Sequence, residues 1–195
     1  MAYKGKNMTL LSLTQNNTRS WFSTMIWALV DSLLLTTSAK IQVPLGIVKI
    51  SMQSLTVIGL GAILGPQIGL AAVVVYLIEG VMGFPVFQSS PERGVGLPYM
   101  MGPTGGYLLG FAISSWFSGW LVQYKGWGQT FVSALGVMFI GHVLIHTPGM
   151  LWLSQLLGWD VTLATTYTFV LGASLKIALG ASALTLWFAR STASH

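Results

Sequence analysis

Six apolar runs, separated by short polar or Gly/Pro-rich stretches, limit what this chain can fold into. They cover residues 21–39, 50–64, 68–82, 103–124, 130–145 and 161–189. A helix needs about 20 apolar residues to cross a bilayer. Charged residues make up only 7% of the chain and hydrophobic residues 53%, so the charges are too few to coat a water-facing surface. The sequence therefore predicts an all-α integral membrane protein with six transmembrane helices.

Prolines and glycines predict where the helices end. Pro44 and Gly46 indicate a loop after the first run, and Gly65-Pro66 ends the second, because proline lacks the N–H that a helix interior needs. Thr147-Pro148-Gly149 is expected to end the fifth helix. A short interfacial helix over residues 150–157 and a loop containing Asp160 should follow it.

Six spans place both termini on one side of the membrane, and an excess of Lys and Arg marks the cytoplasmic side. The expected cytoplasmic positions carry Lys4, Lys6, Arg19, Lys125 and Arg190, against Lys40, Lys49 and Arg93 outside. We therefore expect one membrane domain, 1–195, with cytoplasmic tails at 1–20 and 190–195, a bundle over 21–189 and an outer loop over 83–102. Residues 1–20 are interpreted as a tail because they lack the pattern of a cleaved signal peptide. The expected location is the cell membrane, which is the inner membrane in a Gram-negative cell.

Composition excludes several functions. The net charge of +5 is spread thinly and forms no basic patch, which argues against nucleic-acid binding. The absence of cysteine excludes disulfides and thiolate metal sites. No phosphate-binding G-x-x-x-x-G-K-[ST] loop is present, so the chain does not hydrolyse ATP by that route. We expect no bound cofactor or metal.

The segment Gly80–Phe111 differs most from the rest of the chain. It contains eight of the 23 glycines and four of the seven prolines. Irregular backbone is not tolerated in contact with lipid, so this segment must face water or be buried in protein. Its two interpretations are a long extracellular turn and a cover over a small-molecule pocket.

Three acidic or basic side chains, counting Asp, Glu, Lys and Arg, fall within the apolar runs. Lys176 either pairs or lines a pathway inside the membrane, or extends its stem to an interface. Asp31 and Glu79 either form a proton path or bond to neighbouring helices. Glu92 and Arg93 lie in the outer loop, as an ordinary solvated ion pair or as ligand contacts.

Histidines and serines suggest two further sites. His142 and His146 are four residues apart, a spacing that suits metal ligation, but no third ligand is nearby in sequence. Ser114, Ser115 and Ser118 supply nucleophile candidates with His142 as base, although nothing orients such a pair. An intramembrane hydrolase is therefore an alternative, and a stand-alone carrier of another small carboxylate vitamin is a second.

The segments GFPVF and GVGLPYMMGPTGGYLLGF, within Gly80–Phe111, resemble the BioY family of biotin-specific S components of energy-coupling-factor (ECF) transporters. ISMQSL (Ile50–Leu55) and GAILGPQIG (Gly61–Gly69) are similar to the same family's second helix and turn. GASLK (Gly172–Lys176) lies where the family usually has Gly-Asp-x-x-Lys. These matches run in order over most of residues 50–176.

The resemblance implies a six-helix bundle of the ECF S-component type that captures biotin near the extracytoplasmic face, beneath the loops after its first and third helices. It also implies a transmembrane coupling subunit, docked on the first helix, and two ABC-type ATPases. In this chain the nearest equivalents of the family's docking pattern are Ala28 and Ser32. Two departures are Ala173, where the family has Asp, and Gly94, where some members have Asn.

A biotin site would be mostly apolar with a few placed polar groups. Tyr99, Tyr107, Phe87 and Trp152 are candidates to pack against the ligand, and Gln53 and Gln88 to hydrogen-bond with it. Lys176 or Arg93 would meet an anionic or carbonyl oxygen. The bonds that an Asp at position 173 would supply are assigned to Ser174, Glu92, Arg93 or Gln88.

Overall fold

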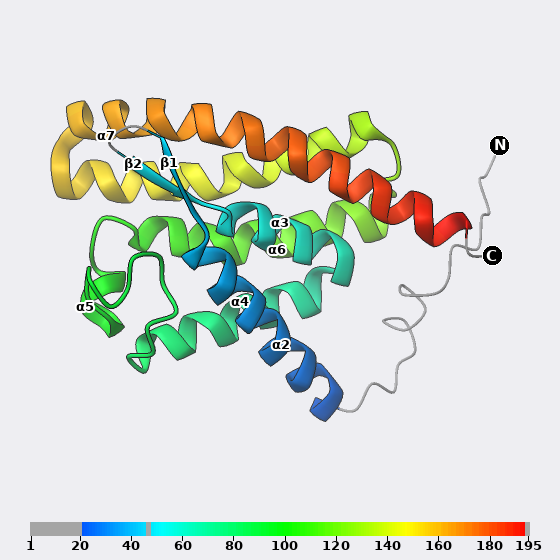
Figure 1. Cartoon of the computed structure of the whole chain (residues 1–195), viewed down its shortest axis with the longest axis horizontal. Coiled ribbons are helices and arrows are strands. Elements are labelled where there is room, and N and C mark those ends of the chain that lie inside the picture. The colour runs from blue at the N-terminus through cyan, green and yellow to red at the C-terminus, as the bar shows by residue number, and fades with distance from the viewer. Residues whose placement is uncertain (1–20, 46–47, 194–195) are drawn as a thin grey trace.

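The computed structural model describes residues 21–45 and 48–193, which form a helical bundle interrupted by one short hairpin (Figure 1). The helices are α2 (Trp21–Lys40), α3 (Gln53–Leu64), α4 (Pro66–Val81), α5 (Gly96–Met100), α6 (Gly105–Lys125) and α7 (Phe131–Ala193). The predicted helical fold is confirmed, while the predicted tail 1–20 lies outside the described residues. Residues 190–193, predicted as tail, continue α7.

The loop predicted at Pro44 and Gly46 includes a two-stranded antiparallel hairpin. Strand β1 (Gln42–Leu45) pairs with β2 (Val48–Ser51), with Val43 opposite Ile50. The amide of Met52 donates to the carbonyl of Ile41 across the base of the hairpin, at 3.2 Å. As a result α3 begins at Gln53, three residues later than the apolar run suggested.

The predicted break at Gly65-Pro66 is confirmed. Gly65 has a φ of 87°, a left-handed conformation that glycine adopts without steric cost. Pro66 occupies the first turn of α4, where a missing N–H does no harm. Helices α3 and α4 are short, at 12 and 16 residues. Among the described residues, one helix is by itself both long and apolar enough to cross a membrane, over Phe131–Ser191.

The break predicted at Thr147-Pro148-Gly149 is wrong, because α7 stays helical through Pro148. Close packing against α6 holds this region in place: a Cβ added to Gly106 would lie 2.3 Å from the Pro148 carbonyl oxygen. The bend occurs instead at Gly158, whose φ is 79°. Residues 150–157 therefore extend the first arm of α7, and Asp160 lies in the second arm rather than in a loop.

Helices α3, α4 and α6 meet where small residues bring their backbones into contact. A Cβ on Gly61 would lie 2.1 Å from the Ser115 carbonyl oxygen, and a Cβ on Gly119 2.5 Å from the backbone nitrogen of Pro66. We call this region, with Gly61, Gly69, Ser115 and Gly119, the glycine crossing. It leaves no room for even one methyl group, so it fixes the relative positions of the three helices.

One end of the bundle gathers the irregular parts of the chain. The hairpin, α5 with its flanking loops and the bend of α7 lie at the same end in Figure 1, away from the start of α2 and the end of α7. Counting the two arms of α7 separately, the described residues contain six helical segments of 12 residues or more, in addition to the five-residue α5. The cavity described next lies at the irregular end.

Candidate functional site

A cavity of about 270 Å³ lies among α3, α6, both arms of α7 and the loop that precedes α5. Its size is close to the lower end of the roughly 300–1,000 Å³ that is common for small-molecule sites. Polar residues that line it are Ser51, Gln53, Ser54, Gln88, Ser89, Arg93, Thr104, His146, Thr165 and Lys176. The remaining lining residues are Tyr99, Pro103, Tyr107, Leu108, Phe111, Ile145, Leu153, Leu157 and Phe169.

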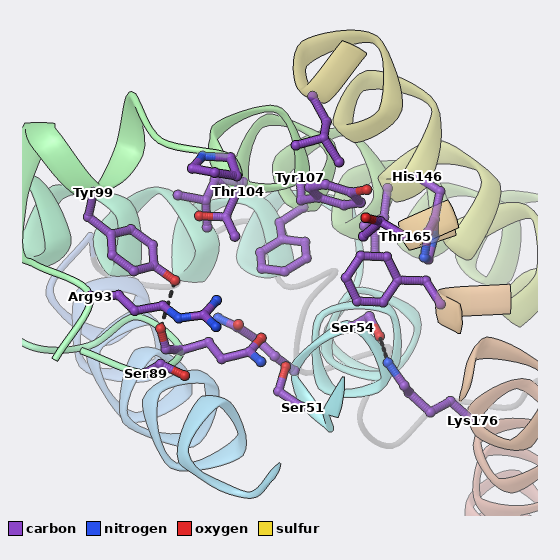
Figure 2. Close-up of a pocket in the computed structure, with 18 of the residues that line it drawn as sticks. Ser51, Ser54, Ser89, Arg93, Tyr99, Thr104, Tyr107, His146, Thr165 and Lys176 are labelled. Carbon is purple, nitrogen blue, oxygen red and sulfur yellow. Dashed lines mark hydrogen bonds between the residues drawn. The ribbon is translucent and has the colours of Figure 1, made fainter. Parts of the chain in front are cut away.

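The cavity has one cationic side chain at each end, and no Asp or Glu is among its lining residues. Lys176, on the second arm of α7, is only 9% exposed, and its Nζ donates to the Ser54 Oγ at 2.8 Å. Arg93 belongs to the exposed loop before α5 and extends its guanidinium into the cavity from the opposite side (Figure 2). Two cations without a carboxylate between them favour a ligand that is anionic or rich in oxygen acceptors.

Aromatic rings form much of the wall between these two ends. The Tyr107 ring packs on the backbone of Gly149 and makes edge contacts with His146 and Phe169, with centroid distances of 5.9 and 5.7 Å. Its hydroxyl oxygen is buried and has no hydrogen-bond partner among the described residues. Buried hydroxyls are normally paired, so a polar atom of a ligand would satisfy this one.

Tyr99 and Phe87 anchor the loop that covers the cavity. The Tyr99 hydroxyl donates to the Gln88 carbonyl at 2.7 Å, and its ring stacks on Phe87 at 4.7 Å. Burial raises the pKa of Tyr99, so its hydroxyl stays protonated and able to donate. Phe87 is fully buried against Gly80, where even a single Cβ would lie 1.9 Å from its ring.

Lys40, at the end of α2, ties that helix to the same loop. Its Nζ donates to the carbonyl oxygens of Phe87 and Ser90 at 3.0 and 2.7 Å. From the sequence, Lys40 was predicted only as a charge on the outer side of the membrane. The ammonium therefore joins two segments that are about fifty positions apart, and it does so without a carboxylate partner in these bonds.

Ser54 lies between Lys176 and His142, the first of two histidines on α7. The Ser54 Oγ lies 3.4 Å from the Nε2 of His142, a long contact. The Nδ1 of His142 lies 2.8 Å from the Met138 carbonyl oxygen, and the Nδ1 of His146 lies 2.8 Å from the carbonyl oxygen of His142. A carbonyl oxygen only accepts, so Nδ1 carries the proton in both rings and Nε2 is the acceptor in each neutral ring.

Six of the ten residues predicted to bind a ligand line the cavity: Gln53, Gln88, Arg93, Tyr99, Tyr107 and Lys176. The amide nitrogen of Gln53 is already engaged, because it donates to the Tyr76 hydroxyl at 2.5 Å. The cavity thus brings together side chains that are up to 125 positions apart, between Ser51 and Lys176.

The other four predicted binding residues do not line the cavity. Glu92 is exposed, and Phe87 lies behind Tyr99. Trp152 donates its indole N–H to the Gly102 carbonyl at 2.9 Å and covers Gly105 and Gly106 from outside the cavity. Ser174 is exposed and bonds to the Val170 carbonyl.

Several lining residues are not among those predicted from the sequence. Thr165, Phe169 and Lys176 are spaced by four and seven positions, which puts them on one helical face. That spacing was a signal by which Thr165 and Phe169 could have been found. Ser54 directly follows the predicted Gln53, whereas His146 was considered only as a metal ligand.

The remaining predicted residues have structural surroundings. Ala28 and Ser32, predicted as docking positions, are buried at 2% and 0% exposure, and Ser32 donates to Glu79 of α4. Their side chains are therefore not on the outer surface of the described chain. Asp31 is buried, and its Oδ2 has no partner among the described residues.

The residues considered for metal binding and for hydrolysis lie on α6 and on the first arm of α7. No group of three or more potential metal ligands is found among residues 21–45 and 48–193. The Ser114 hydroxyl donates to the Gly141 carbonyl at 2.9 Å, and so it is not directed at His142. The hydroxyls of the other two candidates, Ser115 and Ser118, have no hydrogen-bond partner among the described residues.

The fold and its cavity define a class: helical bundles that enclose a small-molecule-sized site at one end. A model of the BioY family matches residues 8–192. The chain belongs to the BioY family. Because the named relatives are transporters, this membership makes the chain a membrane protein, in agreement with its composition.

The matching relatives cover most of the chain. The probable biotin transporter BioY of Pyrococcus horikoshii is 31% identical over 127 residues, 65% of this chain and 72% of that protein. Biotin transporter BioY2 of Lactococcus lactis is 28% identical over 78% of this chain and 80% of its own length. Biotin transporter BioY of Thermotoga maritima is 34% identical over 63% and 76%.

A solved structure shares the fold. The crystal structure of the S-component for biotin from an ECF-type ABC transporter superposes with a TM-score of 0.72, covering 92% of this chain and 94% of the other. The two sequences are 20% identical in that alignment, so the likeness concerns the fold.

Proposed function

We propose that this chain captures biotin and serves in its uptake as the substrate-binding subunit of an ECF-type transporter. The observation that carries the proposal is the charge pattern of the cavity: a cation at each end and aromatic walls between them. Membership of the BioY family, whose named relatives are biotin transporters, supports biotin as the ligand.

The chemistry of biotin suits this cavity. Biotin has an apolar bicycle and chain, a ureido group with N–H donors and a carbonyl acceptor, and a carboxylate. Lys176 and Arg93 supply donors at opposite ends for the two oxygen-bearing groups, and the Tyr107 hydroxyl supplies a further polar contact. Tyr99, Phe111 and Phe169 give the apolar body a wall to pack against.

We propose six membrane spans: α2, α3, α4, α6 and the two arms of α7. Both termini would then be cytoplasmic, and the cavity would open outward in the cell membrane. The short α3 and α4 are accommodated if they tilt little and pack within the bundle, where neighbouring helices shield their ends. Labelling of single cysteines at positions 126 and 94 from each side of the membrane tests this orientation, since they should react from opposite sides.

The chain binds and does not catalyse in this proposal, so energy must come from partners. The partners proposed are a transmembrane coupling subunit and two ABC-type ATPases. The matched structure is named as an S-component from an ECF-type ABC transporter, which supports an assembly with further subunits. A stand-alone carrier would need none of them. Co-purification of ATPase subunits with a tagged chain from its native membrane distinguishes a subunit from a stand-alone carrier.

The direct test is calorimetric titration of the purified chain in detergent with biotin. Lipoate, which has a similar acid chain but no ureido group, is the control ligand. Saturable biotin binding with clear preference over lipoate supports the proposal. Lack of biotin binding at micromolar concentration contradicts it.

A further inference from the structure

Two histidines on the first arm of α7 present hydrogen-bond acceptors rather than donors on their Nε2 atoms. In both rings the Nδ1 proton is directed to a backbone carbonyl four residues earlier, at 2.8 Å. No carboxylate lines the cavity to offset a second positive charge near Lys176, so we assign both rings as neutral. His142 is only 3% exposed and uses its Nε2 toward Ser54.

His146 differs from His142 because it lines the cavity. Its ring lies against three other rings, with centroid distances of 5.9 Å to Tyr107, 6.1 Å to Phe169 and 6.0 Å to His142. Its only hydrogen bond among the described residues is made by Nδ1, which leaves Nε2 as an available acceptor. Figure 2 shows His146 on the same side of the cavity as Lys176.

This end of the cavity therefore pairs a donor with an acceptor. Lys176 offers N–H donors, and His146 offers a fixed lone pair. A carboxylate has only acceptor oxygens and would leave the His146 acceptor unpaired. An amide or urea group carries an oxygen acceptor next to an N–H donor, and so matches both side chains at once.

We propose that His146 is a specificity-determining residue that accepts a hydrogen bond from an N–H group of the ligand. The inference rests on the proposed function: in biotin, the N–H group that donates to His146 would be one of the two ureido N–H groups. Ser54, held between Lys176 and His142, keeps the neighbouring ammonium in place without using the His146 acceptor.

The test compares biotin with derivatives methylated at one or the other ureido nitrogen, by titration of the full chain in detergent. Wild type should bind biotin roughly 3- to 10-fold more tightly than at least one methylated derivative, the range expected for one neutral hydrogen bond. His146→Phe keeps a ring of similar shape without an acceptor, so this preference should fall by about threefold or more. His146→Gln, which restores an acceptor oxygen, should recover part of it.

Ser182→Ala, an exposed position on the second arm of α7, is the matched control and should keep the wild-type preference. A preference that persists in His146→Phe, or that is absent from wild type, overturns the inference. If the Phe variant does not fold, His146→Leu is measured and judged in the same way. Lack of any biotin binding by wild type would instead contradict the proposed function.

Discussion

The two cationic ends of the cavity differ in how far the charged side chain is desolvated and ordered before a ligand binds. Lys176 is buried on a helix and held by Ser54, so its ammonium is desolvated and oriented before a ligand arrives. Arg93 is exposed on a loop, where water and salt screen its charge and its long side chain must be ordered on binding. One positive charge should therefore contribute more to the free energy of ligand binding at Lys176 than at Arg93.

The largest effect is expected for Lys176→Met. Removing a desolvated charged donor should weaken biotin binding by about 1.5–3 kcal/mol, roughly 10- to 100-fold, measured by titration in detergent. The unliganded variant should be at least as stable to heat as wild type, because a buried charge is lost. Ser174→Ala, exposed on the same arm, is the control, and an unchanged affinity in Lys176→Met would remove Lys176 from the site.

Gly106→Ala should damage the frame of the buried end. The added methyl would lie 2.3 Å from the Pro148 carbonyl oxygen and 2.4 Å from the Trp152 Cβ, and neither of these atoms is the far end of a flexible side chain that could shift easily. Overpacking of this kind costs about 1–3 kcal/mol, which should lower the melting temperature in detergent. Gly59→Ala is the matched control, because nothing lies within 4 Å of its added Cβ. Equal melting temperatures for the two variants would contradict the packing described.

Tyr107→Phe tests whether a ligand satisfies the buried hydroxyl. If it does, the variant loses one hydrogen bond, and biotin binding should weaken by about 0.5–1.5 kcal/mol, roughly 3- to 10-fold. The aromatic contacts with His146 and Phe169 are kept. A variant with unchanged affinity and a higher melting temperature would show that the hydroxyl stays unpaired in the complex.

Arg93→Gln should have the smallest effect. An exposed charge of this kind contributes about 0.2–1 kcal/mol, so the affinity should fall only a few-fold. The loss should shrink as salt rises from low to physiological ionic strength, whereas the loss in Lys176→Met should not. Glu92→Gln, a neighbouring exposed residue outside the cavity lining, is the control. A salt-independent loss at Arg93 would mean that this end is desolvated too.

Local rules in the sequence predicted part of this molecule well. The helix stop at Gly65-Pro66 follows from backbone sterics alone. Lys176 is conspicuous because a charged side chain within an apolar membrane segment is costly and normally pairs or lines a pathway. Gln53, Tyr99 and Tyr107 were found through the resemblance to a known family, since no spacing rule joins α3 to α6.

The wrong predictions concern features that are determined by packing between segments distant in the sequence. A proline usually ends a helix, but α7 stays helical through Pro148, where Gly106 of α6 packs closely against it. The bend lies at Gly158 instead. Trp152 has the character of a ligand-packing residue, yet it covers Gly105 and Gly106 from outside. Which face of a helix is directed to the cavity depends on the neighbouring helices, and the sequence of that helix alone does not specify them.

The glycine crossing has a consequence for how a ligand enters and leaves. With backbone touching backbone at Gly61, Ser115 and Gly119, helices α3, α4 and α6 cannot slide apart without losing dense contact. The loop over the cavity makes no such backbone contact in the bonds described above: it is held by side chains, through the buried Phe87 ring, the Lys40 bonds and the Tyr99 hydroxyl. We therefore expect a ligand to enter and leave by movement of this loop rather than of the three helices, and its exchange rate to depend on how often these loop contacts break.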